Sequence, residues 1–221
     1  MSINNDELPH VVLLTGLLSP AWTFLRFKRS LQRKGYQVSV KSYGHLRQPA
    51  EESARDLGDH IDQLEARQIQ LVAHSFGGVV LLHLLEQSSE LRLARLSSLV
   101  FLGSPLKGCE MAAHLTHSRL GAFWRFFLGD SLRRGLDGNQ PAFRLNVPHA
   151  LIAGTSQSVL SRMLNPDMPD GDGLVTLPEA IPENTGSTES EVYRLAVSHA
   201  ALLYDGDCIQ QVLAFLAMTR H

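Results

Sequence analysis

Short apolar runs rich in β-branched residues alternate with segments of helical period along most of this chain of 221 residues. Such runs indicate buried strands, and apolar residues at every third or fourth position indicate helices that cover a sheet. The strands are expected at residues 10–16, 36–43, 69–75, 96–105, 149–155 and 192–197. Strands that alternate with helices pair in parallel and are buried on both faces. The sequence therefore predicts an α/β fold, a mostly parallel doubly wound sheet with helices on both faces.

Two of the expected helices have recognisable ends. The first has Phe24, Phe27 and Leu31 at helical spacing, and Gly35 behind it is typical of a helix C-cap. The last helix has an apolar stripe, and Asp207 before that stripe is expected to be its N-cap. Ligands of such sheets bind beyond the carboxyl ends of the strands, so candidate functional residues are expected there.

The length of the chain favours one domain with a single sizeable core. Two regions interrupt the alternation of strands and helices: residues 107–146, and the stretch 156–191, which is rich in Pro, Gly, Ser and Thr. Long connections in compact domains are usually functional or disordered. We therefore predict a single domain over residues 1–221 with a cap or lid insertion at about 107–146.

Composition narrows the class of protein further. A net charge of −2 gives no electrostatic reason to expect binding to nucleic acid or to an anionic membrane surface. Cys109 and Cys208 lie far apart, form no metal pattern and are expected to be unpaired. Residues 1–10 lack a basic region and no apolar run reaches transmembrane length, so we expect a cytoplasmic protein without stable membrane insertion.

One serine stands where an apolar strand meets an apolar helix. The pentapeptide A-H-S-F-G at residues 73–77 is a variant of G-x-S-x-G, which sets a serine on a sharp strand-to-helix turn. That turn forces two backbones together, so it requires small residues two positions before and after Ser75. It also leaves the Phe76 N–H at a helix N-terminus, where a developing oxyanion is stabilised. On these residues alone, a serine that merely ends a buried strand remains the alternative.

The stretch VAHSFGG resembles the nucleophile elbow of α/β-hydrolase lipases and esterases, especially small bacterial lipases whose elbow begins with Ala. The resemblance implies that Ser75 is a nucleophile with a backbone φ above zero. Members of the family carry an oxyanion loop after the first core strand, usually His-Gly followed by an apolar residue. Here that loop is Thr15-Gly16-Leu17, with Thr15 in place of the histidine. The resemblance therefore implies that the N–H groups of Leu17 and Phe76 form the oxyanion hole.

The same family places an acid and then a histidine after the serine. His199 follows the last expected strand in the stretch SHAALLY, which resembles the region of the catalytic base in the small lipases. The family pattern Asp-Gly-apolar-Val fits Asp172 and implies that it is the acid, with Asp170 and then Asp167 as the other candidates. An ordinary Asp-Gly turn would explain DGDGLV equally well by itself. His74 points away from Ser75 in a regular strand and is expected to be structural.

The resemblance extends to the stretch LGSPLKG at residues 102–108, where family members begin the insertion that covers the active site. Apolar and aromatic residues there would line an acyl pocket, form a mobile lid, or simply anchor the insertion to the core. The candidate substrate-binding residues are Leu18, Leu106, Phe123, Trp124, Phe127 and Val175.

The resemblance thus implies a serine hydrolase with a Ser75–His199–Asp172 triad that cleaves carboxylic esters with an apolar acyl group through an acyl-enzyme. We expect a small-molecule or lipid ester as substrate, no cofactor, no metal and no nucleic-acid partner; the sequence leaves the oligomeric state open. Two alternatives remain. The same triad serves acyltransferases and thioesterases, and the fold also occurs in proteins that bind without catalysis.

Overall fold

The computed structural model describes residues 9–17, 19–42, 48–110, 141, 143, 145–157, 169–183 and 190–219. Within these residues, six strands form one sheet in the order β2-β1-β3-β4-β5-β6, and every neighbouring pair is parallel. The strands are β1 (His10–Leu14), β2 (Gln37–Lys41), β3 (Ile69–His74), β4 (Leu96–Leu102), β5 (His149–Gly154) and β6 (Ser190–Leu195). The α-helices are α1 (Leu25–Arg33), α2 (Ala50–Asp62), α3 (Phe76–Gln87), α4 (Glu90–Leu93), α8 (Leu177–Ala180) and α9 (Gly206–Met218). Two 3₁₀-helices, η2 (Ala21–Phe24) and η3 (Ala201–Leu203), complete the described elements.

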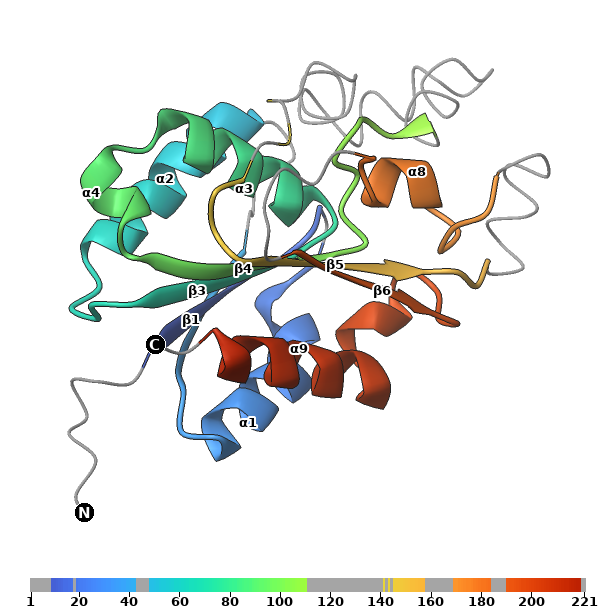
Figure 1. The fold of residues 1–221 in the computed structure, drawn as a ribbon, viewed down its shortest axis with the longest axis horizontal. Helices are drawn as coiled ribbons and strands as arrows, with labels where there is room; N and C mark the ends of the chain where they lie inside the picture. Colours follow the sequence, from blue (N-terminus) through green and yellow to red (C-terminus); the bar gives the residue numbers. More distant parts are fainter. Residues whose placement is uncertain are drawn as a thin grey trace.

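Helices cover both faces of the sheet (Figure 1): α2, α3 and α4 lie over one face, and α1 and α9 lie over the other. The strands supply both cores because alternate residues point to opposite faces. In β1, Val12 and Leu14 belong to the core beside α2 and α3, whereas Val11 and Leu13 belong to the core beside α1 and α9. All four are fully buried. The predicted α/β architecture is confirmed.

The order of the strands defines where a ligand would bind. The chain passes from β1 to β2 on one side, then returns to place β3 on the other side of β1. In open α/β sheets, ligands bind at the carboxyl edge at such a reversal. The pairing of Leu14 with Ala73 aligns the ends of β1 and β3, so the loop after β1 lies beside the turn after β3.

The ends of two helices test the sequence predictions. Gly35 follows the C-cap residue of α1 and has φ 86°, the left-handed conformation that ends many helices, as expected. The predicted N-cap of the last helix is wrong. Asp205 caps α9, since its side chain accepts a hydrogen bond of 2.9 Å from the Cys208 N–H, and Asp207 lies in the first turn. An N-cap needs the extended backbone that Asp205 has at φ −66° and ψ 139°, and Asp207 is already helical.

Cys109 and Cys208 form no disulfide bond, and Cys208 is buried. No helix in the described ranges combines the length and apolarity required to cross a membrane. Most of the predicted insertion lies outside those ranges, at residues 111–140, 142 and 144. The prediction of a cap or lid there therefore stays a prediction, as does the single domain over residues 1–221.

Candidate active site

Ser75 occupies a strained turn between β3 and α3. Its backbone has φ 55° and ψ −125°, and among the described residues it is the only non-glycine residue with positive φ. A non-glycine residue held in this region costs energy and is found most often at functional sites. Ser75 is partly exposed, whereas His74 before it and Phe76 after it are buried. The positive φ expected from the sequence is therefore present, and the hydroxyl-bearing residue is the accessible one.

The turn is possible because its flanking residues are small. A Cβ on Gly77 would lie 2.8 Å from the backbone oxygen of Thr15 and 2.9 Å from the backbone oxygen of Leu14, so the start of α3 packs directly on the end of β1. Ala73 is fully buried beneath the turn. This close approach is the physical requirement that the motif expresses as small residues at these two positions.

The loop after β1 packs directly against Ser75. A Cβ on Gly16 would lie 2.9 Å from the Cβ of Ser75. The N–H of Leu17 follows in this loop, and the N–H of Phe76 opens α3, where helix geometry leaves it without an intrahelical acceptor. In the part of the chain that the structure describes, neither N–H donates a backbone hydrogen bond. Leu17 thus follows a glycine that contacts Ser75, and Phe76 follows Ser75 in the chain. The oxyanion hole formed by their N–H groups stays a prediction.

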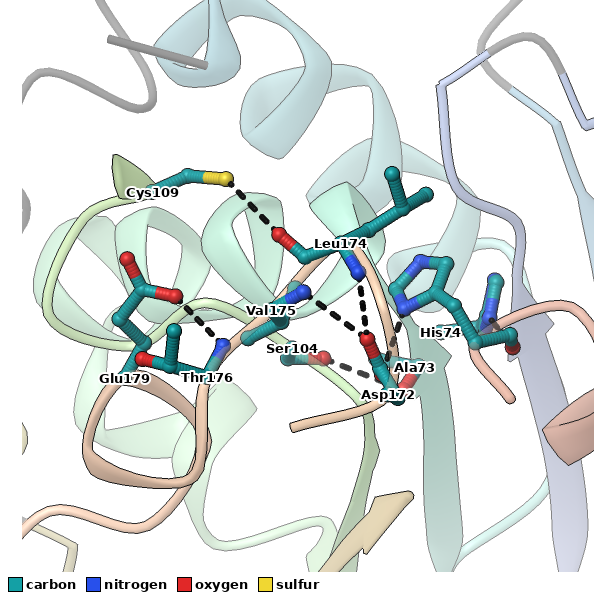
Figure 2. Close-up of polar contacts among 10 residues, drawn as sticks. Ala73, His74, Ser104, Cys109, Asp172, Leu174, Val175, Thr176 and Glu179 are labelled. Carbon is teal, nitrogen blue, oxygen red and sulfur yellow. Dashed lines mark hydrogen bonds and ion pairs between the residues drawn. The ribbon is translucent and has the colours of Figure 1, made fainter. Parts of the chain in front are cut away.

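Asp172 and His199 form a buried hydrogen-bonded pair. The Asp172 Oδ2 atom lies 2.7 Å from His199 Nδ1, and the side chains are 2% and 9% exposed. The second oxygen, Oδ1, accepts hydrogen bonds from the backbone N–H groups of Leu174 at 3.0 Å and Val175 at 2.9 Å (Figure 2). Gly173, with φ 97°, allows this tight turn. A carboxylate at Nδ1 holds the neutral imidazole in the tautomer that leaves Nε2 free to accept a proton.

The structure distinguishes two of the three candidate acids. Asp172 contacts His199, whereas Asp170 is exposed and its backbone oxygen accepts a hydrogen bond of 2.8 Å from the Leu177 N–H. Asp167 lies outside the described residues.

The end of β4 joins the serine turn to the acid–base pair. The Ser75 N–H donates a hydrogen bond of 2.9 Å to the backbone oxygen of Leu102. The next residue is Gly103, where a Cβ would lie 2.8 Å from Asp172 Oδ2 and 3.2 Å from His199 Nδ1. Ser75, Asp172 and His199 therefore gather at one edge of the sheet, beyond the carboxyl ends of the strands.

His74 is buried at the same edge. Its Nε2 atom lies 3.1 Å from the backbone oxygen of His199. Burial, followed by the charge that His199 can carry, lowers the pKa of His74 to about 3. The sequence predicted a structural role from the direction of the side chain and missed the contact with His199. The one signal in the sequence was the position of His74 next to Ser75 at the end of a strand, since the loop that carries His199 is expected at the same edge of the sheet.

The candidate substrate-binding residues are less fully described. Leu106 and Val175 are each 3% exposed; Val175 packs with Ala153 and Ala180. Leu174, beside Val175, is 43% exposed. The others, Leu18, Phe123, Trp124 and Phe127, lie outside the described residues.

The chain belongs to the alpha/beta hydrolase family, because the model of that family matches residues 11–219. A comparison with curated protein sequences gave no match. Among solved structures, the fold is similar to the mature form of a Bacillus licheniformis lipase, with TM-score 0.70 and 18% identity over 96% of this chain and 92% of that one. It is also similar to a metagenomic carboxyl esterase, with TM-score 0.72 and 18% identity over 98% and 77% of the two chains. A pyrethroid hydrolase from Sphingobium faniae has TM-score 0.63 and 16% identity over 96% and 97%.

Proposed function

We propose that this chain is a serine hydrolase that cleaves carboxylic esters with an apolar acyl group. The observation that carries the proposal is the 2.7 Å hydrogen bond between Asp172 and His199, at the edge of the sheet where Ser75 stands at φ 55°. A buried carboxylate–imidazole pair beside a strained, accessible serine is the constellation that acyl transfer uses.

The chemistry follows from the roles of these groups. His199 Nε2 accepts the Ser75 proton as Oγ attacks the ester carbonyl carbon, while the N–H groups of Leu17 and Phe76 stabilise the oxyanion. The intermediate collapses, and the alcohol leaves with the proton from His199. Water then attacks the acyl-enzyme as His199 accepts a proton from it, and the carboxylic acid leaves when Ser75 regains its proton. Asp172 stabilises the imidazolium in both halves of the cycle.

Two further observations support an ester as substrate. Solved structures with this fold include proteins named as a lipase, a carboxyl esterase and pyrethroid hydrolases. The exposed Leu174 provides an apolar surface next to the acid, and residues 107–146 supply further apolar side chains in the sequence. We propose that the latter cover the site as a cap, with Leu18, Phe123, Trp124 and Phe127 facing the acyl chain.

A fluorophosphonate probe, which labels activated serines, tests the nucleophile. We expect labelling of the wild-type protein and none of Ser75→Ala. Ser104→Ala is the control, since Ser104 is another serine just beyond a strand end, and its buried hydroxyl donates to the Ala73 oxygen. Ester hydrolysis should fall by about 10⁴-fold or more in Ser75→Ala and His199→Ala, and by less in Asp172→Ala. A folded wild-type protein that takes no label would instead be a binding protein.

A panel of p-nitrophenyl esters of increasing chain length tests the acyl preference. We expect the rate to rise with chain length beyond acetate, and an optimum at acetate would contradict an apolar acyl site. Product analysis with added alcohols or thioesters separates hydrolysis from acyl transfer and thioester cleavage. Ester products that exceed free acid at modest alcohol concentrations would identify an acyltransferase.

A further inference from the structure

His74 links two parts of the candidate site that lie far apart in the sequence. It is the last residue of β3, and its Nε2 atom lies 3.1 Å from the backbone oxygen of His199, 125 residues further along. The two imidazole rings also contact each other, with centroids 4.7 Å apart and planes inclined by 45°. His74 therefore contacts both the backbone and the ring of the proposed base.

The chemistry of this contact assigns the direction of the hydrogen bond. Burial holds His74 in its neutral form at any pH near neutrality. A neutral imidazole has one N–H, and a carbonyl oxygen can only accept, so the proton of His74 is on Nε2 and is donated to the His199 oxygen. A neutral ring here adds no positive charge beside the imidazolium that His199 forms during catalysis.

The backbone of His199 is thus held at both of its polar groups. The His199 N–H donates a hydrogen bond of 2.9 Å to the backbone oxygen of Asp172. The backbone oxygen of His199 accepts the hydrogen bond from His74 Nε2. The Asp172 carboxylate then fixes the ring at Nδ1. The hydrogen bond from His74 joins this acid–base unit to the strand that carries Ser75.

The other edge of the His74 ring faces the loop after β1. A Cβ on Gly16 would lie 3.2 Å from His74 Nδ1. This nitrogen is buried and has no hydrogen-bond partner among the described residues. Because Gly16 directly precedes Leu17, the ring fills the space between the base and the loop that carries one of the proposed oxyanion donors.

We propose that His74 is a positioning residue, which sets His199 at its working distance from Ser75 and supports the oxyanion loop. The proposal rests on the proposed function. His74 does not touch the reacting atoms and exchanges no proton with the substrate. Its effect acts through the direction of the His199 side chain, and errors of about 1 Å in such geometry cost about 10²-fold in rate.

Three variants separate this role from general support of the fold. His74→Phe keeps an aromatic ring and removes the N–H donor. His74→Gln restores an N–H donor near the position of Nε2. His149→Phe is the matched control, because His149 is also buried, also bonds a backbone oxygen at 3.0 Å and also contacts an aromatic ring. It lies at the amino end of β5, the opposite edge of the sheet.

Two measurements give the expected result. In p-nitrophenyl ester hydrolysis, kcat should fall by about 10- to 100-fold in His74→Phe with KM within about threefold, and His74→Gln should recover most of the loss. His149→Phe should keep kcat within about threefold of the wild-type value. The downfield proton NMR signal of the His199 Nδ1–H, bonded to Asp172, should broaden or shift in His74→Phe and stay unchanged in His149→Phe.

The outcomes that overturn the proposal are distinct. A His74→Phe variant with wild-type kcat and an unchanged His199 signal refutes positioning. His74 has only a structural role if His149→Phe loses as much kcat as His74→Phe does. The same conclusion follows if His74→Phe and His74→Gln both unfold while His149→Phe stays folded. If the wild-type protein cleaves no ester, the proposed function fails, and the NMR signal still decides whether His74 positions His199.

Discussion

The substitution Gly103→Ala should slow the proposed ester hydrolysis strongly without removing any functional group. Gly103 follows β4 and has φ 52°, in the left-handed region. A Cβ there would lie 2.8 Å from Asp172 Oδ2, 2.8 Å from Leu202 Cδ1 and 3.2 Å from His199 Nδ1. The added methyl group would therefore press on both partners of the acid–base hydrogen bond.

The structure indicates which group must move. Asp172 is held through Oδ1 by the N–H groups of Leu174 and Val175, so relief of the contact must come from lengthening of its bond to His199. A displacement of about 1 Å in the base costs about 10²-fold in rate, which is about 2.7 kcal/mol of transition-state stabilisation. We therefore expect kcat/KM to fall by about 10²-fold in Gly103→Ala.

Gly35→Ala is the matched control for the backbone. Gly35 also has a left-handed backbone, at φ 86°, and no atom of the described residues, its own chain neighbours aside, lies within 4 Å of the position of its Cβ. Both substitutions incur about 1–2 kcal/mol of backbone strain, and Gly103→Ala adds about 1–3 kcal/mol for overpacking. Urea unfolding measures the stability of each variant, and ester hydrolysis at a temperature where both are folded measures the rate.

The comparison has a clear refuting outcome. If Gly103→Ala and Gly35→Ala retain similar kcat/KM values, the close packing of Gly103 against the acid–base pair does not control activity, and the geometric reasoning is wrong.

Three further predictions concern stability. A Cβ on Gly78 would lie 2.2 Å from Ser104 Oγ and 2.4 Å from Ser104 Cβ. Gly78→Ala should therefore lower the free energy of unfolding in urea by about 1–3 kcal/mol, and adding Ser104→Gly to that variant should restore much of the loss. A double variant that recovers no stability would argue against this contact. Asp205→Ala should lower the free energy of unfolding by about 1 kcal/mol and Asp207→Ala by clearly less, and equal losses would contradict the assignment of the N-cap. Because the pKa of His74 falls from 6.5 to about 3 on folding, the unfolded chain binds more protons between those pH values, so stability should fall as the pH drops from 6.5 towards 3. His74→Phe should remove up to about 1.4 kcal/mol per pH unit from that slope, and an unaltered slope would show that His74 is not buried and neutral.

The sheet and the serine turn could be predicted because their signals are local. The apolar run of β3 indicates a strand that is buried on both faces. The small residues on either side of Ser75, within a pentapeptide, indicate a turn with positive φ. The ends of the elements were less certain: the strand expected at 36–43 spans Gln37–Lys41. The predicted N-cap of α9 was wrong by two residues because Asp205 and Asp207 are both good capping residues, and the extended backbone at Asp205 decides between them.

The acid and the role of His74 depend on contacts between distant parts of the chain. Asp170 and Asp172 have the same chemistry and nearly the same neighbours, and only the turn at Gly173 directs one carboxylate towards His199. The contact of His74 with His199 spans 125 residues. No periodicity or propensity in a single sequence contains that information.

The positive φ of Ser75 has a consequence for how the sequence itself is maintained. Glycine would adopt φ 55° and ψ −125° with little strain, whereas a serine there costs about 1–3 kcal/mol of backbone strain. Ser75→Gly should therefore make the protein more stable. The backbone conformation at this position favours glycine, but the residue is a serine, so the stability of the fold does not account for its presence. The strain is a cost that selection for stability would remove and that selection for a hydroxyl group would keep.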